Sequence, residues 1–147
     1  MHVIGEWLIC EDGGVRPTLA GVVRTPDGQM VDVPFLLDAG ADRTVFSADF
    51  LDLLVPLQNT AADQIRLAGV GGSVSSITIE AAIGFIRDDR RVVTVRGQFA
   101  VFTEGESAEL SVLGRDVTNN FGVIYDYPNR AVALLAPPHF YEIKRTS

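Results

Sequence analysis

Residues 33–47, VPFLLDAGADRTVFS, place a nearly continuous apolar segment directly before an Asp-Ala-Gly-Ala-Asp turn. The apolar residues 33–37 predict a buried β-strand, and Asp38 follows them directly. A carboxylate beside a glycine at the end of a strand has four interpretations: a helix cap, a calcium ligand, an ordinary turn or half of a catalytic pair. The remainder of the chain has to distinguish among them.

The composition is that of a folded, acidic chain. Its 147 residues are 47% hydrophobic and 21% charged, which excludes disorder and allows a core without disulfides or metal. The formal net charge of -7 gives little attraction to nucleic acid or anionic membranes, so we expect neither as a partner. The mixed segment RDDRR at 87–91 predicts a solvated turn.

The sequence favours a cytoplasmic location. The first residues, MHVIGEWLICEDGG, lack the basic segment and long apolar stretch of a signal peptide. No apolar run approaches the roughly 20 residues of a membrane span. Cys10 is the one cysteine, so an internal disulfide is impossible and we expect a packed thiol.

Short apolar segments separated by Gly, Asp and Pro predict many β-strands. The expected strands are 16–23, 30–37, 81–86, 92–102, 110–113, 123–127 and 130–135. A tight turn, TPDG at 25–28, joins the first two strands. Residues 65–79, IRLAGVGGSVSSITI, predict a long hairpin with a glycine-rich tip.

Two short helices are also expected. The first covers 47–54, with the Ser47 hydroxyl as its cap and Pro56 ending it. The second covers 115–121 and is closed by Gly122. Many strands with two short helices predict a mainly β, barrel-like fold. We expect one domain over 1–147, with an N-terminal extension at 1–15 and a C-terminal tail at 136–147.

Three motifs follow one another: Leu-Leu-Asp-Ala-Gly-Ala at 36–41, Gly-Val-Gly-Gly at 69–72 and Val-Leu-Gly-Arg-Asp at 112–116. Each alone is weak. The glycine motif lacks the spacing of a nucleotide-binding loop, and Asp38 with Asp42 lacks the alternating ligands of a calcium loop. His2 and His139 lie near opposite ends, which favours surface positions over metal ligation. We expect no metal and no cofactor.

In this order the motifs resemble those of the retropepsin-like aspartic proteases: the retroviral proteases, their bacterial relatives and a domain of eukaryotic DNA-damage-inducible proteins. The resemblance covers residues 16–135 and is strongest at LLDAGADRTVF, AGVGG and VLGRDVTNNFGVIYD. It implies a homodimeric acid-protease barrel with a flap hairpin and one or two short helices. The implied activity is aspartic endopeptidase cleavage of an extended peptide or protein substrate.

The chemistry explains the need for a carboxylate pair. Two carboxyl groups sharing one proton activate a water with the charged member and polarise the amide carbonyl with the protonated member. Asp12-Gly13 and Asp27-Gly28 lie in polar turns, so only Asp38 has the required apolar approach. A pair therefore needs Asp38 from each of two chains on a two-fold axis. A shared proton favours an acidic to mildly acidic optimum.

The resemblance also implies roles for neighbouring residues. Asp38 is the catalytic residue, and the loop around it contains Ala39, Gly40 and Ala41. Asp42 binds the substrate backbone, and Arg115 pairs with Asp42 and braces the loop. The flap tip consists of Gly69, Val70, Gly71 and Gly72, with Val70 meeting the other flap. Leu113 and Gly114 lie in the strand behind the aspartate loop.

Ala39 departs from the family, which has Thr or Ser at this position. That hydroxyl grips the partner across the dimer axis, and losing it costs about 1–3 kcal/mol for each group left unpaired. Ala39 leaves open an active enzyme with a weaker dimer, an enzyme active only under some condition, a catalytically inactive dimerisation or peptide-binding domain, and an engineered substitution. An unrelated β-barrel binding module is a further alternative. The hairpin near 125–135 resembles cellular and bacterial members, whose C-terminal strands help to form the dimer sheet.

Overall fold

The first hairpin follows from the local sequence pattern. The computed structural model describes residues 2–62, 75–105 and 110–146. Strands β3 (Val15–Arg24) and β4 (Met30–Leu37) pair antiparallel, and β4 alternates exposed and buried positions. In the turn between them the Gly28 amide donates to the Thr25 carbonyl at 2.9 Å, with Gly28 at φ 87°. The predicted turn is confirmed.

The longest hairpin pairs β6 (Ser76–Ile86) with β7 (Val92–Phe102) along eleven residue pairs. The sequence analysis divided β6 between an arm ending at Ile79 and a strand beginning at Ala81, and this division is wrong. Glu80 is an outward-facing residue in one continuous strand, paired with Gln98. Residues 65–74 of the predicted glycine-rich hairpin lie outside the described residues, as do residues 63 and 64 before them.

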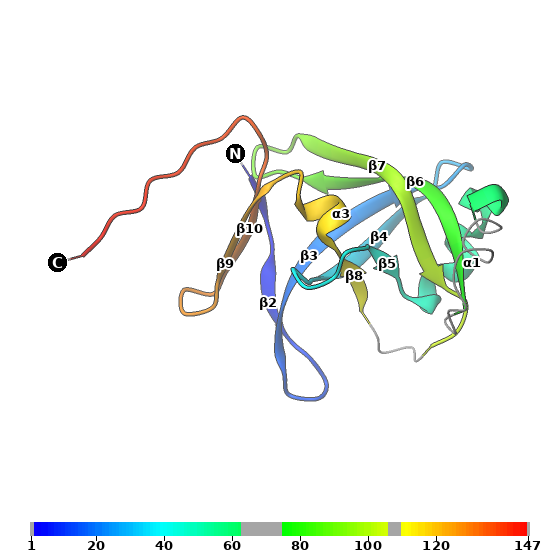
Figure 1. Ribbon diagram of the computed structural model, residues 1–147, viewed down its shortest axis with the longest axis horizontal. Coiled ribbons are helices and arrows are strands. Elements are labelled where there is room, and N and C mark those ends of the chain that lie inside the picture. Colours follow the sequence, from blue (N-terminus) through cyan, green and yellow to red (C-terminus); the bar gives the residue numbers. More distant parts are fainter. Residues whose placement is uncertain (1, 63–74, 106–109, 147) are drawn as a thin grey trace.

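Two short strands close the barrel. Strand β8 (Ser111–Leu113) pairs parallel to β4, and β5 (Val45–Phe46) joins β8 to β7. Pairing of β3 with β6 completes a ring in the order β3-β4-β8-β5-β7-β6, with β2 (Glu6–Ile9) attached to β3 (Figure 1). Large apolar side chains fill the interior, and the Phe35 and Phe46 rings meet edge to face at 5.3 Å. The mainly β, barrel-like prediction is confirmed.

A separate three-stranded sheet lies beside the barrel (Figure 1). Its order is β1 (His2–Ile4), β10 (Ala131–Leu135) and β9 (Gly122–Asp126). The predicted strands near 123–127 and 130–135 are therefore present as β9 and β10. Strands β1 and β2, in the segment expected to be an N-terminal extension, were not predicted.

The first predicted helix is shorter and differently capped. The segment consists of the 3₁₀-helix η1 (Ala48–Phe50), α1 (Leu51–Leu54) and the 3₁₀-helix η2 (Val55–Leu57). The cap prediction for Ser47 is wrong, because its side chain makes no cap hydrogen bond; its amide instead donates to Ser111 Oγ at 2.9 Å. Pro56 does not end the segment but lies inside η2, where its missing amide is tolerated in the first turn.

The second predicted helix is also shorter. Helix α3 (Arg115–Thr118) ends at Asn119, and Gly122 begins β9. The prediction of Gly122 as a helix cap is therefore wrong. Two turn hydrogen bonds lead the chain out of the helix before Gly122: the Asn120 amide to Val117 O at 3.1 Å, and the Phe121 amide to Thr118 O at 3.0 Å.

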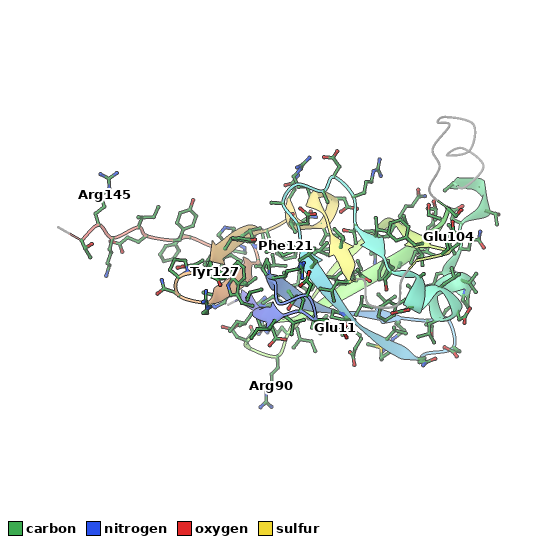
Figure 2. The ribbon with its side chains drawn as sticks, turned by 90° about the horizontal axis from the view of Figure 1, so that it is seen from below. Glu11, Arg90, Glu104, Phe121, Tyr127 and Arg145 are labelled. Carbon is green, nitrogen blue, oxygen red and sulfur yellow. The ribbon has the colours of Figure 1, made fainter. Side chains whose placement is uncertain are left out.

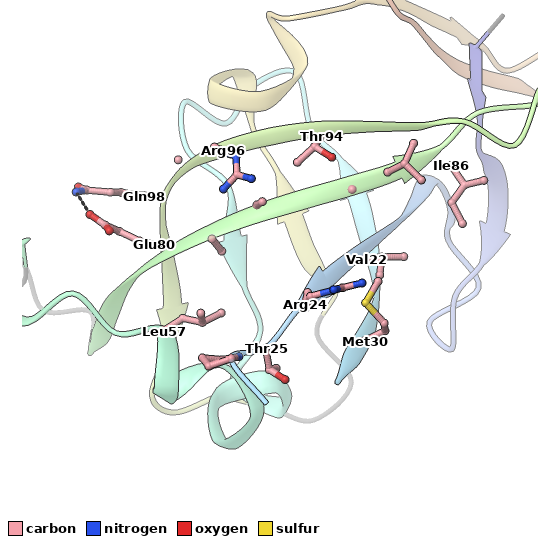
Figure 3. A pocket seen from close by; sticks show the side chains of 16 residues that line it. Val22, Arg24, Thr25, Met30, Leu57, Glu80, Ile86, Thr94, Arg96 and Gln98 are labelled. Carbon is pink, nitrogen blue, oxygen red and sulfur yellow. Dashed lines mark hydrogen bonds between the residues drawn. The ribbon is translucent and has the colours of Figure 1, made fainter. Parts of the chain in front are cut away.

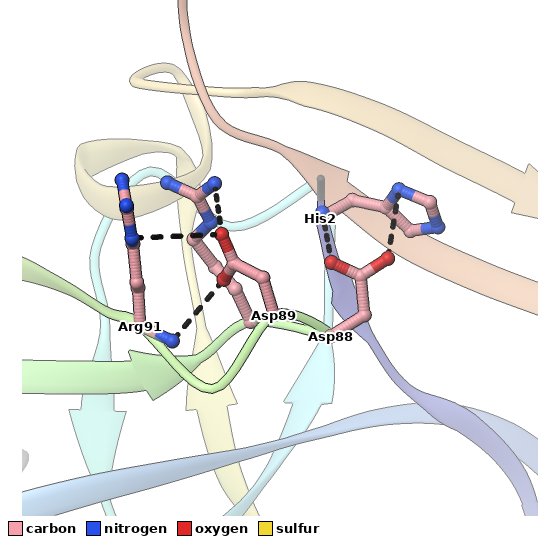
Figure 4. A network of polar contacts seen from close by, with 5 residues as sticks. His2, Asp88, Asp89 and Arg91 are labelled. Carbon is pink, nitrogen blue, oxygen red and sulfur yellow. Dashed lines mark hydrogen bonds and ion pairs between the residues drawn. The ribbon is translucent and has the colours of Figure 1, made fainter.

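The turn at 87–91 is less solvated than expected. The side chains of Arg87 and Asp89 are 20% and 17% exposed and form an ion pair of 2.7 Å. Asp88 Oδ1 accepts a 3.0 Å hydrogen bond from the His2 amide, which ties β1 to this turn (Figure 4). That hydrogen bond lowers the pKa of Asp88 below its usual range.

The two ends of the chain differ. The N-terminal strands pack into the body, whereas residues 137–146 form no strand or helix and extend away from it (Figures 1 and 2). Cys10 is partly buried and free. Among the described residues, no helix is long and apolar enough to cross a membrane.

Candidate active site

The loop between β4 and β5 presents Asp38. Leu37 pairs with Leu113 of the parallel strand β8, and the Asp38 amide donates to the Leu113 carbonyl at 3.2 Å. The loop then turns tightly, with the Gly40 amide donating to Asp38 Oδ1 at 2.9 Å and the Ala41 amide donating to the Asp38 carbonyl at 3.2 Å. The pairing of β4 with β8 thus places the half-buried carboxylate of Asp38 directly after the last residue of β4.

A hydrogen-bond network around the buried Thr44 anchors the far end of this loop. The Thr44 hydroxyl donates to Asp116 Oδ1 at 2.7 Å, and the Thr44 amide donates to Asp116 Oδ2 at 3.0 Å. The Gly114 amide in turn donates to Thr44 Oγ1 at 3.0 Å. Thr44 is fully buried, so its polar atoms depend on these partners. Sequence reasoning assigned no role to Thr44 or Asp116, because they are 72 positions apart and meet only in the folded chain.

Arg115 braces the near end of the loop. Its Nη1 donates to the Ala39 carbonyl at 2.8 Å, and its Nη2 forms an ion pair with Asp42 Oδ1. Its backbone amide donates to the Ala41 carbonyl at 2.8 Å. One residue at the start of α3 therefore holds three residues of the loop by charge and by hydrogen bonds. Asp42 keeps 80% of its side chain exposed, so its other oxygen remains open to solvent.

Gly114 is required where the loop and α3 meet. A Cβ at this position would lie 2.5 Å from the backbone carbon of Arg43 and 2.6 Å from its carbonyl oxygen. Both atoms belong to the backbone and have no flexible side chain to move away. The close approach positions the start of α3 directly against the loop.

A cavity of about 400 Å³ lies beside the loop. It is bounded on one side by loop and β5 residues and on the other by β6 and β7. Its lining residues are Arg43, Thr44, Val45, Ala62, Thr78, Gln98, Phe99 and Ala100. The space is large enough for one or two side chains of a bound peptide.

The structure brings together most of the residues selected from the sequence. Asp38, Ala39, Gly40, Ala41 and Asp42 form one loop, packed against the strand end at Leu113 and the helix start at Gly114 and Arg115. The proposed flap residues Gly69, Val70, Gly71 and Gly72 lie outside the described residues. The functional role of each residue remains a prediction.

The carboxylate of Asp38 is constrained on one side only. Its Oδ1 receives the Gly40 amide, while Oδ2 has no hydrogen-bond partner within residues 2–62, 75–105 and 110–146. In such a carboxylate the amide holds one oxygen in place. The open oxygen can accept a proton from water or pair with a second carboxyl group. In the same parts of the chain, no group of three or more His, Cys, Asp or Glu side chains is arranged to hold a metal ion.

Comparison with solved structures finds chains of similar structure. The chain is similar in structure to a retropepsin-like aspartic protease from Rickettsia conorii, over 91% of this chain and 93% of that chain. The two share 14% sequence identity, with a TM-score of 0.48. No family model and no curated protein matches the sequence.

Proposed function

We propose that the protein is a homodimeric aspartic endopeptidase. The observation that carries this proposal is the state of Asp38. Its half-buried carboxylate ends an apolar strand, and one oxygen is held by the Gly40 amide while the other is free of described partners. The chain supplies one such carboxylate, so two copies are needed to make a pair.

In the dimer, Asp38 of each subunit lies on the two-fold axis. Two carboxylates this close share one proton, because like charges about 3 Å apart do not both ionise. The charged member removes a proton from a water molecule, and the protonated member donates to the oxygen of the scissile amide. The Gly40 amide keeps the carboxylate oriented throughout.

The substrate is an extended peptide. Asp42, with its exposed side chain, accepts a hydrogen bond from a substrate amide, and its pairing with Arg115 fixes where that acceptor lies. The cavity beside Thr44 and Phe99 receives a substrate side chain.

The test is cleavage of a denatured protein mixture between about pH 4 and 7, analysed by mass spectrometry. We expect the natural chain to cut the mixture and the Asp38→Asn variant to lose at least about a thousandfold in rate. Asp49→Asn, at an exposed position in η1, is the matched control and should cut normally. Equal cleavage by the Asp38→Asn variant excludes the proposal.

A second candidate function is a catalytically inactive dimerisation or peptide-binding domain. The observation favouring it is Ala39, whose exposed methyl group offers no hydroxyl, so that only its carbonyl is bound, by Arg115. Ala39→Thr distinguishes the two functions. If the natural chain forms dimers without cleaving and Ala39→Thr cleaves, the inactive domain is the correct function.

A further inference from the structure

A groove of about 1050 Å³ runs over the outer face of the barrel. It is lined by β6 and β7 and by the turn end of the β3–β4 hairpin (Figure 3). Met30 begins β4 at the groove, whereas Asp38 follows the last residue of β4. The eight residues of this strand separate the two places by roughly 25 Å. The groove is therefore distinct from the Asp38 loop.

The groove exists because two neighbouring strands are joined over a short length only. Pairing between β3 and β6 is limited to Val22 with Gly84 and Val23 with Ile83. Beyond these pairs β3 continues into its hairpin with β4, while β6 continues along β7. The floor next to this opening has small residues, Ala82 and Gly84, so little side-chain volume fills it.

Two arginines stand on either side of Ala82. Arg96 is its partner on β7, and Arg24 directly follows Val23, the last residue of β3 that pairs with β6. Figure 3 shows the two side chains coming from strands on opposite sides of β6. Both residues are exposed, and neither forms an ion pair with any residue that the structure describes.

Neither of two neighbouring carboxylates forms an ion pair with these arginines. Glu80 also lines the groove, and its Oε1 accepts hydrogen bonds from Asn59 Nδ2 at 2.8 Å and from Gln98 Nε2 at 3.2 Å. Asp32, on the exposed face of β4, pairs in register with Val22 and lies outside the groove lining. In a protein with a net charge of -7, the groove lining thus has two arginines against one glutamate, a local excess of positive charge. Guanidinium groups favour carboxylate ligands, which they bind with two hydrogen bonds.

Apolar residues lie at one end and on one side of the groove. The cross-strand pair Ile86 and Val92 is 56% and 59% exposed at the end away from Glu80, and Met30, the β4 partner of Arg24, is 54% exposed at the side (Figure 3). From Glu80 to Ile86 the strand extends roughly 20 Å, the length of about six residues of an extended peptide. A small anion would reach the arginines without covering these apolar side chains.

We propose that the groove binds an extended acidic peptide segment of another protein. Glutamate or aspartate side chains of that segment pair with Arg24 and Arg96. Its apolar side chains lie on Ile86 and Val92 at one end of the groove and on Met30 beside Arg24. This site is independent of the protease function, and it binds whether or not Asp38 is catalytic.

The test uses a fluorescein-labelled heptapeptide, LELELEL, and measures its fluorescence anisotropy. The protein is the full chain carrying Asp38→Asn, so that cleavage of the peptide does not interfere. We expect saturable binding that weakens about threefold with Arg24→Gln or Arg96→Gln and about tenfold with both. Arg90→Gln is the matched control, because Arg90 is exposed and lies outside the groove (Figure 2).

A neutral peptide and a charge-reversed variant test whether charge pairing drives the binding. The peptide LQLQLQL should bind at least about tenfold more weakly than LELELEL, and added salt should weaken LELELEL binding. The double variant Arg24→Glu, Arg96→Glu should prefer LKLKLKL, which a merely unfolded variant would not do.

Three results would overturn the proposal. The first is equal binding of LELELEL by the double glutamine variant. The second is complete competition by inorganic phosphate with no contribution from the leucines, which defines an anion site only. The third is a shift in oligomeric state on mutation of both arginines, with no binding of the peptide, which makes the groove a contact between copies of this chain.

Discussion

The Asp38 loop and the three-stranded sheet differ in how far their side chains find partners within one chain. In the loop, the polar groups at both ends find partners within one chain: Thr44 with Asp116, and Arg115 with Asp42 and Ala39. In the sheet, large apolar side chains are left in solvent. Those on β9 and the turn after it are Val123 at 44%, Ile124 at 39%, Tyr125 at 57% and Tyr127 at 42% exposure.

For the proposed dimer, the difference indicates which region a second copy would cover. Strand β9 is an edge strand, and one of its sides carries no ladder partner in the described part of the chain. Trp7 orders this surface by packing edge to face on Tyr125 and Tyr127, with ring centroids 5.0 and 4.9 Å away. We therefore expect the loop to keep its geometry in a single chain and the sheet to contribute to dimer contacts.

The largest effect on stability is expected from a substitution that disrupts the packing of the loop. Gly114→Ala forces a Cβ to within 2.5 Å of the Arg43 backbone, so the strand end and helix start separate. We expect a loss of at least about 3 kcal/mol in the free energy of unfolding, measured by urea denaturation. Gly97→Ala is the control, because its Cβ would meet only the Phe99 ring, at 3.2 Å. Similar losses for both variants would contradict the close approach at Gly114.

The second prediction removes one anchor of the loop. Asp116→Ala leaves the buried Thr44 amide and hydroxyl without their acceptor, at a cost of about 1–3 kcal/mol. Chemical denaturation measures this loss, and Asp49→Ala at an exposed site should cost less than about 0.5 kcal/mol. If Asp116→Ala is as stable as the natural chain, the Thr44 network does not hold the loop.

The third prediction tests the uncovered sheet. Ile124→Glu places a charge on the surface that we assign to the dimer, where burying it without a partner is unfavourable. We expect the dimer dissociation constant to rise at least about tenfold, or about 1.4 kcal/mol, by sedimentation. Val55→Glu, at a residue 44% exposed in η2, should leave dimerisation unchanged. An unaffected dimer in the Ile124→Glu variant would place the interface elsewhere.

The smallest effect concerns an ion pair outside both regions. In the β2–β3 turn, hydrogen bonds from the Arg16 guanidinium lower the pKa of Asp12 from 3.8 to about 2. Because the folded-state pKa is depressed, the stability this pair contributes is present above about pH 4. It is lost as the pH falls toward about 2. NMR titration of Asp12 should show this midpoint, and Arg16→Gln should return it toward 3.8; an unchanged midpoint would contradict the assignment.

Local sequence patterns predicted the strands and the loop better than they predicted the ends of elements. Alternation on β4 and the TPDG turn were sufficient for the first hairpin. The Ser47 cap failed because the buried Ser47 hydroxyl has no hydrogen-bond partner among the described residues, while the Ser47 amide donates to Ser111 Oγ, 64 residues away. A cap is a local pattern, whereas the position of Ser47 against Ser111 depends on the tertiary fold.

The candidate site was predicted in part for the same reason. Asp38 and Gly40 interact within one tight turn, so their motif is visible in the sequence. Thr44 and Asp116 meet only after the barrel closes, and neither has a distinctive local pattern. The outer groove likewise depends on where the pairing of β3 and β6 stops, which residue spacing does not reveal.

The long-range anchor between Thr44 and Asp116 has a consequence for protein synthesis. The two residues are 72 positions apart, and β8 and α3 leave the ribosome after the whole β6–β7 hairpin. A nascent chain that contains Asp38 but not yet Asp116 lacks the acceptor that orders the loop. The far end of the Asp38 loop is therefore anchored only when nearly four-fifths of the chain has been translated, so the candidate site is completed late in synthesis.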